Sequence, residues 1–157
     1  MQAGERLPQW FVSQWFNAPA PLAPADLRGR VVLLHTFQML CPGCVAHGIP
    51  QAARVHEALP DVAVIGLHTV FEHHEAMQPP ALAVFLHEYR IRYPVGVDAP
   101  GIDSPIPQTM AMLQLKGTPS VVLLDRAGRI RLSHFGQVGD LELGAVLGQL
   151  LAETGQG

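Results

Sequence analysis

Residues 37–47 read FQMLCPGCVAH and contain both cysteines of the 157-residue chain, Cys41 and Cys44. The segment lies where a hydrophobic strand is expected to pass into a helix. A Cys-x-x-Cys pair in a chain with alternating strands and helices is typical of a redox dithiol, which opens and closes a disulfide. The alternatives are two unrelated core cysteines or a structural zinc site, and the latter would need a second ligand pair at comparable spacing.

The composition fits a single domain of ordinary size. Hydrophobic residues make up 48% of the chain, enough for a core without metal or disulfide staples. The net charge is −3 and the basic residues are scattered, which argues against a nucleic-acid partner. The N-terminus has no signal-like apolar region and no run approaches the roughly 18 apolar residues of a membrane span. A cytoplasmic chain is expected, although one trimmed of its leader would look the same.

Strand-like and helix-like segments alternate along the sequence. Two buried strands are predicted at 31–37 and 62–67, joined by a helix over 42–59 that bends near Gly48 and Pro50. This βαβ unit implies parallel pairing with a right-handed crossover. The further predictions are a loop at 68–80, a helix at 81–90, an extended segment at 93–98, a short helix at 108–115, a hairpin of strands 120–124 and 129–135, and a helix at 139–151.

The ends of the chain are expected to be less regular. Residues 9–17 read as a helical or irregular lead-in whose aromatic residues, among them Trp10 and Trp15, pack on the domain or form a docking surface. Prolines make residues 18–25 an extended connector. We therefore predict one domain over 1–157, with an N-terminal lead-in at 1–25, a core at 26–151 and a frayed tail at 152–157.

Several of these features together resemble the thioredoxin superfamily. They are the Cys41-Pro42-Gly43-Cys44 motif after a strand, the Gly117-Thr118-Pro119 turn before another strand, and the closing hairpin. The chain is most similar to the redoxin, AhpC/TSA-like and TlpA/ResA-type thiol-disulfide oxidoreductases. The resemblance implies an α/β, thioredoxin-like fold, a central mixed β-sheet flanked by helices. It also implies an N-terminal extension and an insertion between the βαβ unit and a cis-Pro turn.

The sequence departs from these relatives around the cysteines. Leu40 stands where Trp is common, and the dipeptide Pro42-Gly43 reverses that of thioredoxin. His35 replaces the buried acid of thioredoxins, and His47 replaces the Glu of many ResA-like proteins. A peroxiredoxin-type enzyme would have Thr at the position of Gln38. The redox potential and the choice of partner are the properties that these changes affect.

The motif positions suggest separate roles for the two thiols. Cys41 is expected at the first turn of a helix, where free N–H groups stabilise a thiolate, and is predicted to be the nucleophile. Cys44 is predicted to be the deeper, resolving thiol. The resemblance implies that the Thr118–Pro119 bond is cis, and that the Thr118 backbone pairs with the partner chain. The alternative is a trans Pro that only opens a strand.

His35 and His47 are candidates for proton transfer. Histidine titrates near neutral pH, so either could take the proton of Cys44 or hold Cys41 as a thiolate. The alternative for His35 is a satisfied core residue in an apolar strand.

These observations predict a thiol-disulfide oxidoreductase that reduces protein disulfides. Its partners would be protein thiols and disulfides and an unidentified electron donor, with no nucleic acid and no membrane, and the chain would be a monomer or weak dimer. No cofactor is expected beyond the redox-active disulfide Cys41–Cys44. One alternative is a peroxide-reducing redoxin. The other is a copper- or zinc-binding module, in which His68, His73 and His74 would join the cysteines and His47.

Overall fold

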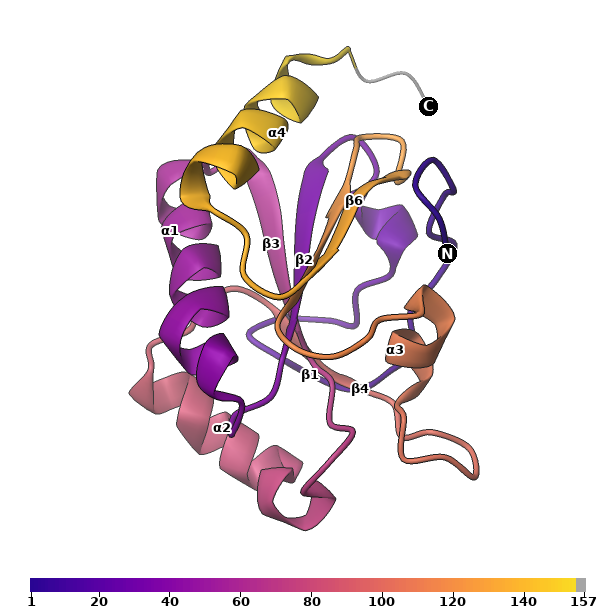
Figure 1. Cartoon of the computed structure of the whole chain (residues 1–157), viewed down its shortest axis with the longest axis vertical. Helices are drawn as coiled ribbons and strands as arrows, with labels where there is room; N and C mark the ends of the chain where they lie inside the picture. The colour runs from indigo at the N-terminus through magenta and orange to yellow at the C-terminus, as the bar shows by residue number, and fades with distance from the viewer. Residues whose placement is uncertain (155–157) are drawn as a thin grey trace.

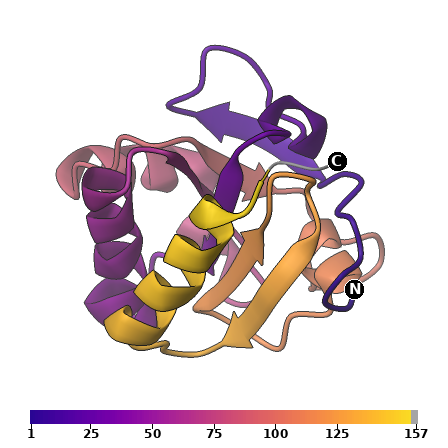
Figure 2. The same ribbon diagram turned by 90° about the horizontal axis from the view of Figure 1, so that it is seen from above.

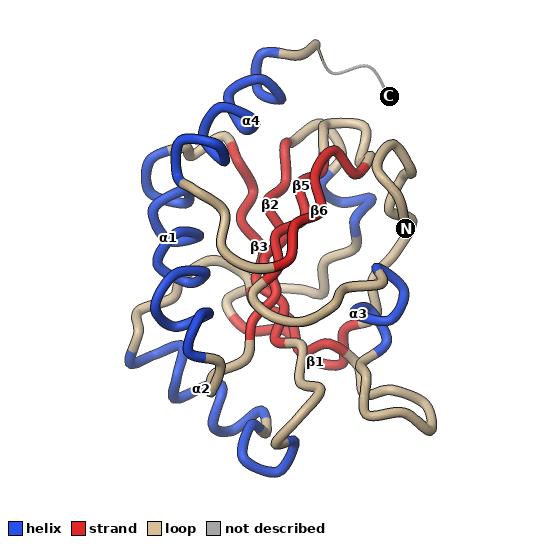
Figure 3. The backbone as a smooth tube through the Cα atoms, in the orientation of Figure 1, coloured by secondary structure: helices blue, strands red, loops and turns tan. Residues whose placement is uncertain are grey.

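A mixed sheet forms the centre of the molecule (Figure 1, Figure 3). The structure is a computed structural model that describes residues 1–154, so the fraying predicted for 155–157 lies outside the described residues. The six strands have the spatial order β1-β4-β3-β2-β5-β6. Their bounds are β1 Val12–Phe16, β2 Val31–Phe37, β3 Val62–His68, β4 Val95–Asp98, β5 Ser120–Leu124 and β6 Ile130–Phe135.

The strand that leads into the cysteine motif, β2, lies in the middle of the sheet. It pairs in parallel with β3 and antiparallel with β5, so that Leu34 lies opposite Ile65 on one side and Val122 on the other. All seven residues of β2 are buried. A β-branched, apolar run with little alternation favours such a position, covered on both faces. The parallel βαβ pairing and the closing hairpin are both confirmed.

Helices cover the two faces unequally. The helices α1, α2 and α4 lie on one face, and α3 lies on the other with the N-terminal segment, as Figure 2 shows from above. No helix within residues 1–154 combines the length and apolar character needed to cross a membrane. The helical bounds are 3₁₀ Pro24–Leu27, π Cys44–Gly48, α1 Ile49–Ala58, 3₁₀ His74–Met77, α2 Pro79–Glu88, α3 Gln108–Leu113 and α4 Asp140–Ala152.

The core has two parts because alternate residues of β2 point to opposite faces. Leu33 and Phe37 belong to the part under α1, α2 and α4, which also contains Cys44. Val32 and Leu34 belong to the other part, with Leu7 and Trp10 of the N-terminal segment. The buried cysteine of the redox motif, Cys44, therefore lies in the larger part of the core, which the helices cover.

The predicted helical or irregular lead-in is a strand. Residues Val12–Phe16 form β1, which pairs antiparallel with β4 at the edge of the sheet. Trp10 is buried and donates its indole N–H to the carbonyl of Leu22 at 2.7 Å. Pairing with a strand some 80 residues later decides this conformation, and no local pattern encodes it.

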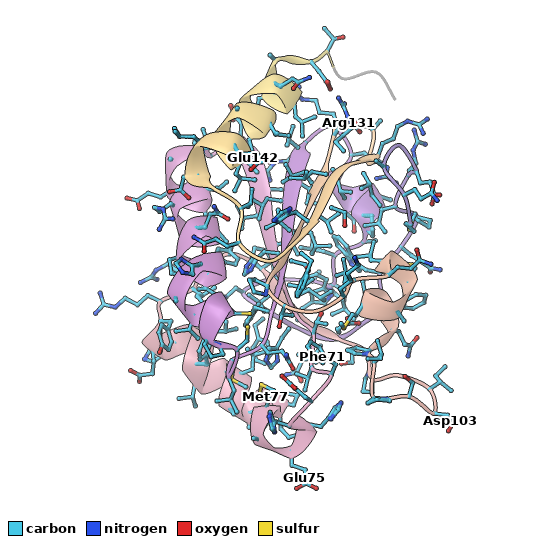
Figure 4. All side chains as sticks on the ribbon, in the orientation of Figure 1. Phe71, Glu75, Met77, Asp103, Arg131 and Glu142 are labelled. Atoms are coloured by element: carbon cyan, nitrogen blue, oxygen red, sulfur yellow. The ribbon has the colours of Figure 1, made fainter. Side chains whose placement is uncertain are left out.

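Other boundaries shift by a few residues. The predicted bend near Gly48 is the π-helical turn Cys44–Gly48. At the other end α4 continues to Ala152, and the Glu153 carboxylate pairs with Arg131 of β6 at 2.7 and 2.8 Å. Arg131 is labelled in Figure 4 beside this end of the chain. The start of the predicted frayed tail is thus fixed to the hairpin.

Candidate active site

Cys41 and Cys44 lie where β2 has ended and the helical segment begins. Cys41 is half-buried, Cys44 is fully buried, and both are free thiols. The backbone N–H of Cys44 donates to Cys41 Sγ at 3.3 Å, and the Cys41 carbonyl accepts from the N–H groups of Cys44 and Val45 at 3.1 Å. The first helical turn therefore presents a donor to the Cys41 sulfur, an arrangement that stabilises a thiolate.

The environment of Cys44 is different. Burial raises the pKa of its thiol well above the ordinary value, and a hydrogen bond with Cys41 adds to this. The backbone of Gln38 and the hydroxyl of Thr118 lower the same pKa, but by less. One sulfur is thus accessible with a donor directed at it, and the other is buried and protonated. This is the difference expected between an attacking and a resolving thiol.

The turn at Thr118–Pro119 lies against both cysteines. Its peptide bond is cis, and the Cys41 thiol donates to the Thr118 carbonyl at 3.5 Å. The Pro119 ring packs on the helical segment so closely that a Cβ on Gly43 would lie 3.4 Å from it and a Cβ on Gly48 only 2.9 Å. Gly48 therefore sets how near the turn can come to the helix.

We expect Gly48→Ala to lower the free energy of unfolding by about 1–3 kcal/mol and to slow disulfide exchange. Gly48 has φ −62°, so alanine is unstrained there and only the contact with Pro119 opposes it. The matched control is Gly144→Ala in α4, whose Cβ would meet nothing within 4 Å, and this change should stabilise by about 1 kcal/mol. Denaturant titration of both variants measures the difference, and equal effects would contradict the contact.

Gln38 is a buried residue of the site, although its sequence position indicated only a departure from peroxiredoxins. It is 1% exposed. Its Nε2 donates to Thr118 Oγ1 at 3.2 Å, and its Oε1 accepts from the Phe71 backbone N–H at 3.2 Å. Its carbonyl accepts from the Cys41 N–H at 3.1 Å. Figure 4 labels Phe71, on the loop that follows β3.

His68 is a second buried polar residue beside the motif. Its Nε2 accepts from the backbone N–H of Met39 at 3.2 Å. Burial lowers the pKa of His68 to about 4, so the ring is neutral near pH 7 and keeps this nitrogen as an acceptor. Together, His68 and Gln38 fix the short segment between β2 and Cys41. His68 thus holds the backbone just before Cys41 in place, whereas the sequence suggested for it only the role of a metal ligand.

We expect stability to fall as the pH is lowered from about 6.5 towards 4. Burial lowers the pKa of His68 to about 4 and that of His35 to about 3, from 6.5. The unfolded chain then binds more protons in this range, so stability is full above pH 6.5 and is lost on acidification, by about 1.4 kcal/mol per pH unit for each histidine. His68→Gln keeps an acceptor for Met39 and should remove one such contribution in unfolding titrations at several pH values. An unchanged slope would contradict it.

The two histidines proposed for proton transfer lie in different settings. His35 is buried, its Nε2 is 2.9 Å from the Tyr93 hydroxyl, and its ring stacks on Phe37. His47 is exposed, whereas Cys44 is buried. Within residues 1–154 neither histidine forms a hydrogen bond with a cysteine. Their roles in proton transfer stay predictions.

The predicted metal alternative gains no support from the geometry. In the described part of the chain, no three His, Cys, Asp or Glu side chains are grouped so that they could hold a metal ion. His68 is engaged with the Met39 backbone, His74 Nε2 lies 3.0 Å from the Pro105 carbonyl oxygen, and His73 is exposed.

Comparison with solved structures identifies the fold and its chemistry. A thioredoxin-like superfamily protein is 56% identical over 96% of this chain and 99% of its own, with a TM-score of 0.94. A thiol-disulfide isomerase from Corynebacterium glutamicum is 52% identical over 96% and 98% of the two chains, with a TM-score of 0.91. StoA from Bacillus subtilis, 19% identical with a TM-score of 0.68 over 90% and 98%, shares the fold. No family model and no curated protein matches.

The chain belongs to the thioredoxin superfamily. It is a thiol-disulfide oxidoreductase, and its two cysteines have the Cys-x-x-Cys spacing of such enzymes. The predicted thioredoxin-like fold, a mixed sheet flanked by helices, is confirmed.

Proposed function

We propose that this enzyme reduces protein disulfides, with Cys41 as the nucleophile and Cys44 as the resolving thiol, in a reducing cytoplasm. The observation that carries the proposal is the asymmetry of the pair. The half-buried Cys41 sulfur receives the Cys44 N–H at 3.3 Å, whereas the Cys44 thiol is fully buried. The Pro42-Gly43 dipeptide between them leaves this dithiol chemistry intact.

The reaction would proceed through a mixed disulfide. The Cys41 thiolate attacks one sulfur of the substrate disulfide, which breaks that S–S bond and releases the other sulfur as a thiol after protonation. Cys44 then attacks Cys41, forming the Cys41–Cys44 bond and releasing the partner's second thiol. Two electrons pass from the enzyme dithiol to the substrate, and an electron donor must reduce the enzyme again.

The turn at Thr118 supplies a place for the partner chain. Its carbonyl lies 3.5 Å from Cys41 Sγ, so an extended segment that offers a disulfide to Cys41 would also reach the backbone beside Pro119. Two large apolar side chains near this point are exposed: Leu40, next to Cys41, is 59% exposed, and Phe135, whose ring lies beside Gly117, is 52% exposed. An extended, partly apolar protein segment is therefore the substrate that we propose.

Reduction of insulin by the full chain, with dithiothreitol as the electron donor, tests this function. The chain should accelerate the precipitation of insulin B chains beyond the rate with dithiothreitol alone. Peroxide consumption and protection of the thiols by zinc or copper test the alternatives of a peroxide-reducing redoxin and a metal module. Insulin reduction that requires peroxide, or that requires zinc or copper, would contradict the proposal.

Disulfide isomerisation is a second candidate, favoured because a protein 52% identical to this chain is described as a thiol-disulfide isomerase. The standard potential of the Cys41–Cys44 couple separates the two. Equilibration with glutathione should give a standard potential of about −270 mV if the enzyme is a reductant of the thioredoxin kind, and of about −180 mV if it is an isomerase.

The proposed proton-transfer role of His47 has a simple test. If His47 holds Cys41 as a thiolate, His47→Ala should change the dependence of the Cys41 alkylation rate on pH. An unchanged profile would remove His47 from the mechanism.

A further inference from the structure

The side chain of Gln38 joins the cysteine turn to two segments that are distant in the sequence. The amide nitrogen donates to the Thr118 hydroxyl, 80 residues away, and the amide oxygen accepts from the Phe71 backbone, 33 residues away. Gln38 is 1% exposed, and its carbonyl also receives the N–H of Cys41. These bonds place Gln38 between the nucleophile and the cis-Pro turn.

The hydrogen bonds fix the direction of the Thr118 hydroxyl. The Phe71 N–H can only donate, so it must face Gln38 Oε1, and the NH₂ group then faces Thr118. Because an NH₂ group also only donates, Thr118 Oγ1 is the acceptor of this bond. A hydroxyl has a single proton, and that of Thr118 remains free to donate to another group.

The other group at hand is the Cys44 sulfur. The Thr118 turn lies against the dithiol, since the Thr118 carbonyl is 3.5 Å from Cys41 Sγ and Pro119 touches Gly43 and Gly48 around Cys44. A hydrogen bond from the Thr118 side chain lowers the pKa of the Cys44 thiol, against the larger effect of burial, so the hydroxyl favours the ionised form of Cys44. A buried thiolate gains most from such a donor.

We propose that Gln38 is a positioning residue that acts through Thr118, directing the Thr118 hydroxyl proton at the Cys44 sulfur as that sulfur ionises in the resolving step. The inference rests on the proposed function. In this step Cys44 attacks Cys41 in the mixed disulfide, the Cys41–Cys44 bond forms, and the bond from Cys41 to the partner sulfur breaks. The proton of Cys44 ends on the departing partner thiol, so no further reactant is needed.

The resolving step can be observed on the reduced full-length chain with Ellman's reagent. Cys41 attack releases one equivalent of coloured thiolate and leaves an aromatic mixed disulfide on Cys41. Cys44 attack then releases the second equivalent. Gln38→Met and Thr118→Val should each slow the second release about tenfold, the effect of one hydrogen bond to a developing charge. Thr118→Ser, which keeps a hydroxyl, should restore most of the rate.

The double variant separates positioning from packing. If Gln38 acts through the hydroxyl, Gln38→Met should have little further effect in the Thr118→Val background, because the proton that it directs is already gone. Independent packing effects would multiply. Gln51→Met is the matched control, since Gln51 is also buried and bonds to Val138 and Asp140, away from the cysteines. It should release both equivalents at the normal rates.

Gln38→Asn serves as a second variant if Gln38→Met fails to fold, because it stays polar but is too short to keep the Thr118 contact. The inference is overturned if the rate reductions of the two single variants multiply in the double variant, or if Thr118→Ser releases the second equivalent as slowly as Thr118→Val. In both cases the wild type still releases both equivalents. A wild type that gives no second release would overturn the proposed function itself.

Discussion

Cys41→Ser is expected to abolish disulfide exchange, whereas Cys44→Ser should retain the first attack and accumulate a mixed disulfide. The half-buried Cys41 sulfur receives the Cys44 N–H, and serine cannot replace it as a nucleophile at neutral pH. In Cys44→Ser that backbone donor remains, but no thiol is left to resolve the intermediate. Insulin reduction should fall to the background rate in both variants.

Mass spectrometry of the two variants after incubation with a disulfide peptide distinguishes their defects. Cys44→Ser should carry one peptide on Cys41, and Cys41→Ser should carry none. The control is the wild-type chain, which should show the oxidised pair and no adduct. A peptide adduct on Cys44 in the Cys41→Ser variant, formed as fast as that on Cys41, would reverse the assigned roles.

Phe37→Ala should lower the free energy of unfolding by about 3–5 kcal/mol, the effect of removing a buried aromatic ring. Phe37 is the last residue of β2 and is fully buried. Its ring centroid lies 5.3 Å from that of His35, 5.1 Å from that of His68 and 6.3 Å from that of Phe85. A loss of this size approaches the total stability of many domains.

Denaturant titration measures the loss, and Leu141→Ala provides the control. Leu141 lies on α4 and is 92% exposed, so its truncation should change stability by no more than about 0.5 kcal/mol. Phe37→Leu should fall between the two, because it keeps part of the apolar volume. A Phe37→Ala variant as stable as Leu141→Ala would mean that the aromatic cluster does not support the end of β2.

The parts of the fold that could be predicted are those with a strong local pattern. The apolar, β-branched runs of β2, β3 and β5 indicated buried strands, and the Asp125–Gly128 turn indicated the hairpin. The edge strand β1 could not be predicted, because its conformation depends on β4, and its aromatic residues suit a helix or a strand equally well.

The candidate site was predictable in its sulfur chemistry but not in its polar surroundings. A spacing pattern reveals Cys41 and Cys44, whereas Gln38 acts through bonds to Thr118 and Phe71 that exist only in the folded chain. The only local sign was that Gln38 is a polar residue directly after a buried strand. The π turn that contains Cys44 and His47 was not predictable either: its i→i+5 hydrogen bonds give more residues per turn than an α-helix, and no spacing pattern in the sequence indicates this.

The bonds of Gln38 also show that the site is assembled from segments far apart in the chain. The cysteine turn, the Phe71 backbone and the Thr118 hydroxyl meet at one buried amide, and the last of them is encoded late in the chain. The donor to Cys41 Sγ, the Cys44 N–H, belongs to the motif itself, whereas the Thr118 hydroxyl comes from a segment about 75 residues later. The polar groups around the Cys44 sulfur are therefore brought together by the pairing of β5 with β2, and not by the cysteine turn alone.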